Sequence, residues 1–397
     1  EYVVVDERCV VSPSGEEFLI HVSEGPSAAA VGLIEPWATV EGSYSWAERN
    51  HIAEGGRLLV VGEGNIDGLL RDHTPGETVR ISEDAVAEQS DEDFDDIVYF
   101  GSNADTIEAL GGLLGTRAVL CIVLGGGEID RQVSVDIGRI HYDFIRYCGT
   151  TGNDPAEGYS WIPSTGDLRE GDKVAIIGAA GPMGQMHTMR AITSGVPGIS
   201  VAGTDLSDER LAGLRSVVGP VAEERGVPLE IINTGDTPLQ SGYTHLSCMV
   251  PVPALVAQAV DLAADGAILN AFAGIPAGTF GDFDMQGIIE RRIFILGTSG
   301  SDVSDMRTVL RKIEEGVIDT TISLYAVTGM AGFADAINAV MERTSGGKIM
   351  VFPMLHDLGL TPLADMPEVL PEVAAKLANG LWTKEAEEAL LATAKKA

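Results

Sequence analysis

Short apolar runs separated by amphipathic stretches dominate the middle of the chain. Between residues 172 and 302 the apolar runs predict strands over Val174–Ile177, Ile199–Ala202, Ile231–Asn233, His245–Val250, Ala267–Phe272 and Ile293–Leu296. The stretches between them predict helices over Met183–Ser194, Ser207–Val218, Pro253–Ala264 and Asp284–Arg291. Strands that alternate with helices favour a parallel, doubly wound α/β sheet.

A shorter version of the same pattern occupies residues 51–152. It predicts strands over Arg57–Val61, Thr78–Ser82, Ile97–Phe100 and Ala118–Leu124, with a helix over Asp105–Leu114. The stretch Gly149–Asp154, which reads GTTGND, resembles Gly297–Asp302, which reads GTSGSD. We interpret the two patterns as an internal repeat.

The first repeat is the shorter one, and it is shortened near its glycine turn and first helix. That turn, Gly62–Gly68, contains Glu63 and Asp67, which would repel a phosphate group. We therefore expect the first repeat to be degenerate and structural. The alternative is that it binds a small ligand of its own.

The second repeat begins with a glycine turn in the stretch Lys173–Gly184, KVAIIGAAGPMG. Its three glycines, Gly178, Gly181 and Gly184, stand between an apolar strand and a helix. Such a turn lets the backbone approach a pyrophosphate, whose charge the N–H groups of the helix start would hold. We expect those groups to come from Pro182's neighbours, Met183 and Gly184. The alternative is a glycine turn that binds nothing.

An acidic residue follows this turn at the distance typical of a dinucleotide site. Asp205 ends the next strand, 21 residues beyond Gly184. Its carboxylate should accept both adenosine ribose hydroxyls and exclude a 2′-phosphate, which favours NAD over NADP. Arg210 stands close by, either against the same ribose or in a surface salt bridge with Asp208 or Glu209.

Composition limits the classes of function. The chain has 397 residues, enough for two or three domains, and its 59 acidic and 26 basic residues give a net charge of −33. This charge repels phosphate-rich polymers, so we expect no nucleic-acid partner. No apolar run is long enough to span a bilayer and no signal peptide opens the chain, so we expect no membrane partner and a cytoplasmic location. The four cysteines, Cys9, Cys121, Cys148 and Cys248, are too far apart to predict a structural zinc site or a disulfide framework.

Three segments resemble the medium-chain dehydrogenase/reductase superfamily. Leu33–Ala38 (LIEPWA) is similar to its Glu-Pro helix start, Asp172–Gly184 with Thr204–Leu211 to its NAD site, and Gly316–Pro353 to its return to the catalytic domain. Within the superfamily the chain resembles the sorbitol, threonine and L-sorbose-1-phosphate dehydrogenases. It departs from the family in three ways. The N-terminal half of the catalytic barrel is missing, two dinucleotide-type units stand where the family has one, and Ala179 occupies the slot of the first glycine.

The resemblance implies two tandem Rossmann-like doubly wound parallel sheets plus remnants of a GroES-like β-barrel. It implies a division into a barrel remnant with the Glu-Pro helix (1–50), a degenerate Rossmann-like unit (51–152), a linker (153–171), an NAD-binding Rossmann domain (172–302), a return to the catalytic domain (303–353) and a helical tail (354–397). In this division, strand-like runs at Tyr2–Val5 and Glu17–Val22 open the chain, and Gln89–Asp96 is an acidic loop. The family commonly forms oligomers, so we expect a homo-oligomer.

The resemblance also implies the reaction, a hydride transfer between a secondary alcohol and the nicotinamide, with zinc polarising the alcohol oxygen. Glu35 matches a family zinc position, and its alternative is an ionic helix start. Zinc would bind only with the missing N-terminal ligands, because one carboxylate cannot make a three-ligand site. Phe272 and Ala273 follow a strand and either border the nicotinamide or form a plain strand-to-loop turn.

His141 is a candidate catalytic residue because the second repeat has Ile289-Glu290 near that place. Its alternative is a structural histidine. The sequence thus predicts an NAD-dependent, zinc-type dehydrogenase of a polyol, sugar or sugar phosphate, with a small-molecule substrate. The alternative is a non-catalytic NAD-binding or scaffold subunit.

Overall fold

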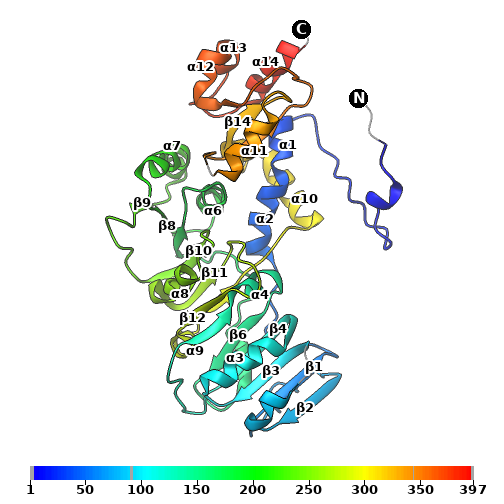
Figure 1. Ribbon diagram of the computed structural model, residues 1–397, viewed down its shortest axis with the longest axis vertical. Helices are drawn as coiled ribbons and strands as arrows, with labels where there is room; N and C mark the ends of the chain where they lie inside the picture. The colour runs from blue at the N-terminus through cyan, green and yellow to red at the C-terminus, as the bar shows by residue number, and fades with distance from the viewer. Residues whose placement is uncertain (1–3, 90–92, 343, 395–397) are drawn as a thin grey trace. The chain divides into compact units, whose positions relative to one another are not determined.

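The computed structural model describes residues 4–89, 93–342 and 344–394, and the chain divides into two compact units (Figure 1). The larger unit runs over Ser43–Ser299 and contains both repeats. The smaller unit joins Glu1–Gly42 to Gly300–Ala397.

The second repeat forms a parallel sheet with the strand order β13-β11-β10-β7-β8-β9. Its strands are β7 (Lys173–Ile177), β8 (Ser200–Asp205), β9 (Leu229–Asn233), β10 (Tyr243–Cys248), β11 (Ala263–Asn270) and β13 (Phe294–Leu296). Counted along the chain this is the order 3-2-1-4-5-6 of a dinucleotide-binding sheet, in which ligands bind where the order reverses, between β7 and β10. The predicted doubly wound sheet is confirmed.

The helices of this repeat cover both faces of its sheet. They are α6 (Pro182–Thr193), α7 (Asp208–Arg225), α8 (Pro253–Leu262) and α9 (Met285–Arg291). Val256 and Val260 of α8 share an apolar core with Leu246 and Leu269, which point to one face of the sheet. Adjacent side chains on a strand point to opposite faces, so His245 lies on the other one.

The first repeat forms a parallel sheet with the order β2-β1-β3-β4-β6. Its strands are β1 (Arg57–Val61), β2 (Glu77–Ile81), β3 (Phe94–Phe100), β4 (Leu114–Val123) and β6 (Arg146–Thr150), with helix α3 (Ala104–Leu113) between β3 and β4. This is the order of the second repeat without a counterpart of β9 in the described residues. Residues 62–76, all described, contain no helix between β1 and β2. The shortening predicted near the first glycine turn therefore removed the helix that would hold a phosphate.

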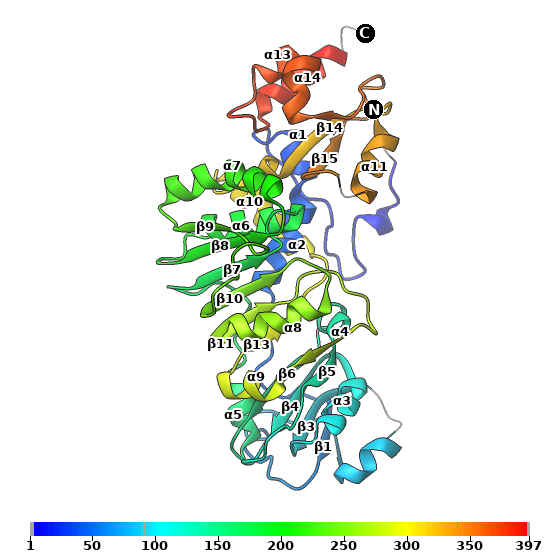
Figure 2. The ribbon, with the colours of Figure 1, turned by 60° about the vertical axis from the view of Figure 1, so that its left-hand side comes forward.

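The two repeats are joined by a short antiparallel ribbon. Strand β5 (Val133–Asp136) of the first repeat pairs with β12 (Phe280–Phe283) of the second repeat. Helix α4 (Ile137–Tyr142) follows β5 as α9 follows β12. One continuous apolar core contains Leu110 and Ile122 of the first repeat together with Leu269 of the second. Figure 2 shows the sheet that contains β3, β4 and β6 next to the sheet that contains β10, β11 and β13. Both sheets therefore form a single folded body.

Two segments of the larger unit differ from their expected secondary structure. The acidic loop expected over Gln89–Asp96 ends early, because β3 begins at Phe94, and residues 90–92 lie outside the described residues. Residues 153–171, expected as a linker, contain helix α5 (Pro155–Ser160). Tyr159 in that helix is buried and its hydroxyl donates to the Asp96 carboxylate at 2.7 Å.

The smaller unit contains a sheet ordered β15-β14-β16 and the helices around it. Trp37 ties its two chain segments together, since the indole N–H lies 3.2 Å from the Thr320 carbonyl and from the Ser323 hydroxyl. Its helices are α1 (Ala28–Gly32), α2 (Ile34–Ser45, ending in the larger unit), α10 (Val303–Glu314), α11 (Phe333–Met341), α12 (Met366–Val369), α13 (Pro371–Ala374) and α14 (Lys384–Ala394), and its strands are β14 (Leu324–Thr328), β15 (Lys348–Val351) and β16 (Thr361–Pro362). Short 3-10 turns along the chain cover Glu7–Cys9, Glu83–Glu88, Thr320–Ser323 and Leu363–Asp365.

The described residues near the start of the chain do not form the strands expected there. Val4 and Val5 are exposed and outside any strand, while Tyr2 and Val3 lie outside the described residues. Glu17 forms one isolated bridge with Val11, and residues 18–22 pair with no strand among the described residues. An apolar run becomes a strand only where a neighbouring strand takes its hydrogen bonds.

The shared core predicts a stability effect. Leu110 in α3 is fully buried in it. Leu110→Ala should lower the free energy of unfolding by about 2–5 kcal/mol, because the cavity it leaves cannot fully collapse. Urea denaturation followed by circular dichroism measures this loss, with the exposed Leu70→Ala as the control. A loss below about 1 kcal/mol for Leu110→Ala would contradict the assignment of this core.

Candidate functional site

The glycine turn of the second repeat is shaped by two close approaches. Gly178 has a φ of +83°, and a Cβ added to it would lie 2.6 Å from Cγ2 of Val250. A Cβ added to Gly184 would lie 2.3 Å from the Gly178 carbonyl oxygen. Both positions therefore require glycine, and together they bring the start of α6 against the end of β7.

The start of α6 presents free donors. Gly181 is its N-cap and Pro182 lies in the first turn, and no side chain caps the helix. The backbone N–H groups of Met183 and Gly184 belong to the first turn, where an α-helix provides no acceptor. Together with the positive end of the helix dipole, they are the kind of donors that suit an anion at the switch point of the sheet.

Asp205 and Arg210 meet beside this turn. The Asp205 carboxylate accepts hydrogen bonds from the N–H groups of Leu206 at 2.9 Å and Ser207 at 3.3 Å. Its Oδ2 lies 3.3 Å from Nη2 of Arg210, whose side chain is 54% exposed. The same guanidinium nitrogen lies 3.4 Å from the position of a Cβ on Gly181. Arg210 therefore pairs with Asp205 rather than with its neighbours Asp208 and Glu209, and it faces the site.

A chain of ring contacts lies beyond the end of β11. The His141 ring lies edge-on to Tyr142 at 4.6 Å and to Phe272 at 6.4 Å. Phe272 is in turn edge-on to His187 of α6 at 4.4 Å, and Nδ1 of His187 is 2.9 Å from the Tyr44 hydroxyl. His141 and Phe272, which sequence analysis singled out separately, are thus brought together, and Ala273 lies next to them with its N–H donating to the Cys248 carbonyl at 3.0 Å.

Buried polar side chains line the same region, and sequence analysis missed them. His187, His245, Ser247, Asn270 and Thr298 are each at most 2% exposed. Each has a polar side-chain atom without a hydrogen-bond partner in the described part of the chain. Ser247 and Asn270 are directly paired on β10 and β11. Buried polar groups almost always find partners, so these atoms have unused hydrogen-bonding capacity. The signal in the sequence was a polar residue inside each of two apolar strands.

The histidines of this region are neutral. Burial lowers the pKa of His141, and it lowers the pKa of His187 well below its usual range. Burial also lowers the pKa of His245 to about 4, against the hydrogen bond that its Nε2 shares with the Gly166 carbonyl. Nδ1 of His141 lies 3.3 Å from the Ala271 carbonyl oxygen. Since a carbonyl only accepts, Nδ1 carries the proton and Nε2 is left as an acceptor.

The residues present do not fit a zinc ion. Glu35 is exposed in the smaller unit, and its Oε1 accepts from the Thr39 hydroxyl at 3.3 Å. Among the described residues no group of three or more His, Cys, Asp or Glu side chains could hold a metal ion. Glu35 therefore has no further ligand beside it in this part of the chain.

The corresponding turn of the first repeat is filled. Gly62 also has a positive φ, +84°, but a Cβ on Gly64 would lie 2.1 Å from the Phe100 ring. The aromatic ring thus covers this turn, and the helix that would follow it is absent from residues 62–76, which the structure describes in full. This turn therefore lacks the open space and the following helix that an anion-binding turn has.

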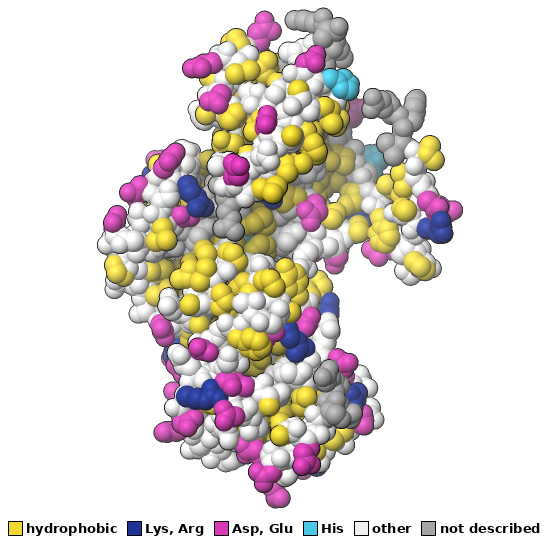
Figure 3. Space-filling model, viewed as in Figure 1, with side chains coloured by type: hydrophobic (Ala, Val, Ile, Leu, Met, Phe, Trp, Pro, Cys, Tyr) yellow, Lys and Arg dark blue, Asp and Glu magenta, His cyan; other side chains and the backbone are white. Residues whose placement is uncertain are grey.

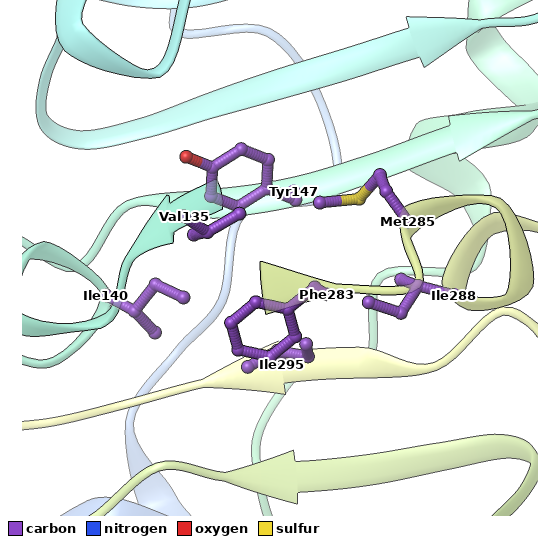
Figure 4. A pocket seen from close by; sticks show the side chains of 7 residues that line it. All are labelled: Val135, Ile140, Tyr147, Phe283, Met285, Ile288 and Ile295. Atoms are coloured by element: carbon purple, nitrogen blue, oxygen red, sulfur yellow. The ribbon is translucent and has the colours of Figure 1, made fainter. Parts of the chain in front are cut away.

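Two other features bear on where ligands bind. A small cavity of about 10 Å³ at the joint between the repeats is lined by Val135, Ile140, Tyr147, Phe283, Met285, Ile288 and Ile295 (Figure 4). It is too small and too apolar for a sugar-like substrate. Figure 3 shows acidic side chains spread over the visible face of both units, in keeping with the net charge of −33. In the described residues, no helix has the length and hydropathy needed to cross a bilayer.

No family model matches the chain. The chain is similar to mannitol-1-phosphate 5-dehydrogenase of Aliivibrio fischeri, with 28% identity over 247 residues, 56% of this chain and 57% of that protein. It is also similar to L-sorbose 1-phosphate reductase of Klebsiella pneumoniae, with 29% identity over 156 residues, 38% of this chain and 37% of that protein. The chain thus spans little more than half the length of the first and less than half of the second.

A solved structure overlaps part of the chain as well. The chain is similar to the short chain alcohol dehydrogenase of Escherichia coli CFT073, complexed with NADH. The match covers 44% of this chain and 49% of the dehydrogenase. The identity is 22% and the TM-score 0.34.

The buried histidines predict a pH dependence of stability. The pKa of His245 is about 4 in the folded chain against 6.5 when unfolded, so the unfolded state binds the proton more readily. Its contribution is complete above about pH 6.5 and falls as the pH drops towards 4, by at most about 3 kcal/mol. When the pH is lowered from about 8 to about 5, the free energy of unfolding, measured by urea denaturation, should fall less in His245→Gln than in the unmodified protein. The exposed His356→Gln should lose as much as the unmodified protein, and an equal loss in His245→Gln would contradict the assignment.

Proposed function

We propose that the larger unit binds NAD(H) at the turn between β7 and α6 and exchanges a hydride with a small polyol, sugar or sugar phosphate. The observation that carries this proposal is the pair of close approaches at Gly178 and Gly184, which brings the free amides of α6 to the switch point of a 3-2-1-4-5-6 sheet. The nicotinamide ring supplies the hydride chemistry when the cofactor is bound.

Each part of the cofactor has residues that fit it. The N–H groups of Met183 and Gly184 at the start of α6 suit the pyrophosphate, and the Asp205 carboxylate at the end of β8 suits the adenosine ribose hydroxyls. Phe272 and Ala273, at the carboxyl end of β11, suit the border of the nicotinamide. Arg210, paired with Asp205, lies where it can approach the same phosphates and ribose.

His141 suits the role of proton acceptor. Its buried imidazole is neutral, and the hydrogen bond to Ala271 leaves Nε2 with a free electron pair. When an alcohol is oxidised its hydroxyl proton must leave as the hydride departs, and a neutral imidazole beside the reacting carbon takes such a proton. The hydrogen-bonding capacity of Ser247, Asn270 and Thr298 suits a substrate with several hydroxyl groups.

The relatives support the substrate class. Mannitol-1-phosphate 5-dehydrogenase and L-sorbose 1-phosphate reductase are oxidoreductases named for phosphorylated sugar alcohols and sugars. The second candidate is a non-catalytic NAD-binding subunit. The observation that favours it is the lack of a metal-binding group among the described residues.

The ion pair between Asp205 and Arg210 predicts a change of cofactor preference. Asp205→Ser removes the acceptor for the ribose hydroxyls and frees Arg210 for a 2′-phosphate. NADH affinity should fall about tenfold or more, and NADPH should become the tighter ligand. Fluorescence titration of both nucleotides measures this. The control is Asp208→Ser, which removes a neighbouring carboxylate that accepts from Asn233 and should keep the preference for NADH. An unchanged NADH affinity in Asp205→Ser would contradict the ribose assignment.

The proposed reaction predicts turnover that depends on His141. Mannitol 1-phosphate with NAD should produce NADH, and L-sorbose 1-phosphate with NADH should consume it, as followed by NADH absorbance. His141→Asn should lower kcat about 100-fold or more with little change in the Kd for NADH. Binding of NADH without turnover of either substrate would favour the non-catalytic candidate. Full activity in His141→Asn would contradict the role of His141 as proton acceptor.

A further inference from the structure

The first repeat reaches into the candidate site of the second. The loop 271–279 follows β11, and its end is held by the start of α4. The Gly278 N–H donates to Oδ2 of Asp136 at 2.7 Å, and the Ile137 N–H donates to the Thr279 carbonyl at 3.1 Å. Helix α4 of the first repeat thus positions the loop 271–279 of the second repeat.

The contact between helix and loop is backbone to backbone. A Cβ added to Gly138 would lie 2.3 Å from the Pro276 carbonyl oxygen and 2.4 Å from the Ala277 nitrogen. Only glycine at position 138 lets α4 lie this close to the loop. A larger residue there must displace either the helix or the loop.

The first repeat also holds the residue after β13. Nη2 of Arg146 donates to the Gly297 carbonyl at 3.1 Å, and Arg146 is 3% exposed. Two short hydrogen bonds to the Glu48 carboxylate, at 2.8 and 2.9 Å, fix its guanidinium. A Cβ on Gly297 would lie 2.9 Å from Cα of His141. Both strand ends beside the proposed nicotinamide position therefore rest on the first repeat.

Tyr142 is the exposed end of this contact. Its side chain is 47% exposed, and its hydroxyl lies 3.0 Å from the position of a Cβ on Gly274. Its ring is edge-on to His141, which continues to Phe272. A half-exposed aromatic side chain beside Gly274 can pack against a flat ring bound at the loop that begins with Phe272.

The two repeats are related by an approximate symmetry, but some corresponding positions carry different residues. Asp136, His141 and Gly149 correspond to Asp284, Ile289 and Gly297, each pair 148 positions apart. His141 packs on Gly297, and in the mirrored contact Ile289 lies 3.0 Å from the position of a Cβ on Gly149. The pair His141-Tyr142 thus lies at the strand end beside the candidate site, whereas Ile289-Glu290 lies at the corresponding strand end of the first repeat. Glu290 accepts a hydrogen bond from Gln286 on its own helix at 2.6 Å.

We propose that the first repeat acts as a built-in partner of the second, with α4 positioning the loop 271–279 and Tyr142 forming one wall of the pocket for the nicotinamide ring. This inference rests on the proposed binding of NAD(H) to the second repeat. Tyr142 is a contact residue for the cofactor and Gly138 a positioning residue. Neither touches the adenine half of the site, which lies at Gly178, Gly184 and Asp205.

The test compares a whole cofactor with its adenine half. Isothermal titration of NADH and of AMP gives the Kd of each for the unmodified chain and for Tyr142→Ala, Tyr142→Phe and Gly138→Ala. Tyr142→Ala should weaken NADH about three- to tenfold and leave AMP unchanged, because only the nicotinamide end loses a contact. Tyr142→Phe should keep most of the affinity for NADH. Gly138→Ala should also weaken NADH and spare AMP, because it displaces only the loop.

Two controls are matched to these variants. Glu290→Ala changes the position of the second repeat that corresponds to Tyr142. Gly112 lies in the first repeat, as Gly138 does, and a Cβ on it would meet nothing within 4 Å. Glu290→Ala and Gly112→Ala should change neither Kd. Unchanged NADH affinity in Tyr142→Ala, or an equal loss for AMP, overturns the inference. If the unmodified chain binds neither NADH nor AMP, the proposed function itself fails.

Discussion

The pairing of β5 with β12 is the contact on which the rest of the larger unit depends. It joins one strand of each repeat in an antiparallel ribbon, and the apolar core beneath it passes from one sheet to the other without a break. Because α4 and α9 follow these strands directly, the ribbon also fixes where each helix meets the opposite repeat. The buried Arg146 and its partner Glu48 extend this joint to the strand ends, where an unpaired charge would be costly.

Two repeats in one chain can diverge as long as the joint is kept. An anion site needs a glycine turn, a following helix with free N–H groups and a close approach between them, and the second repeat has all three. The first repeat has a glycine turn, but Phe100 fills it and residues 62–76, described throughout, contain no helix. What the first repeat kept is the surface that supports its neighbour. On our account, one copy carries the nucleotide and the other completes its site.

Local rules predicted the parts of the site that are local. The turn at Gly178–Gly184, the helix after it and Asp205 follow from residue types at fixed spacing, and the structure forms the turn and helix as expected. The partner of Arg210 stayed open because several acids lie within its reach. The contacts of His141 with Ala271 and Phe272 are 130 residues or more apart in the chain, so no spacing rule could find them. The strand expected at Glu17–Val22, and Val4 and Val5 of the one expected at Tyr2–Val5, are not in strands, because a run of apolar residues does not specify a pairing partner.

A crystal structure of the chain grown with NADH tests the central claim most directly. We expect the pyrophosphate at the amides of Met183 and Gly184, the adenosine ribose at Asp205 and the nicotinamide between Phe272 and Tyr142. Cofactor density at the Gly62–Gly68 turn, or a nicotinamide directed away from the loop 271–279, would contradict it.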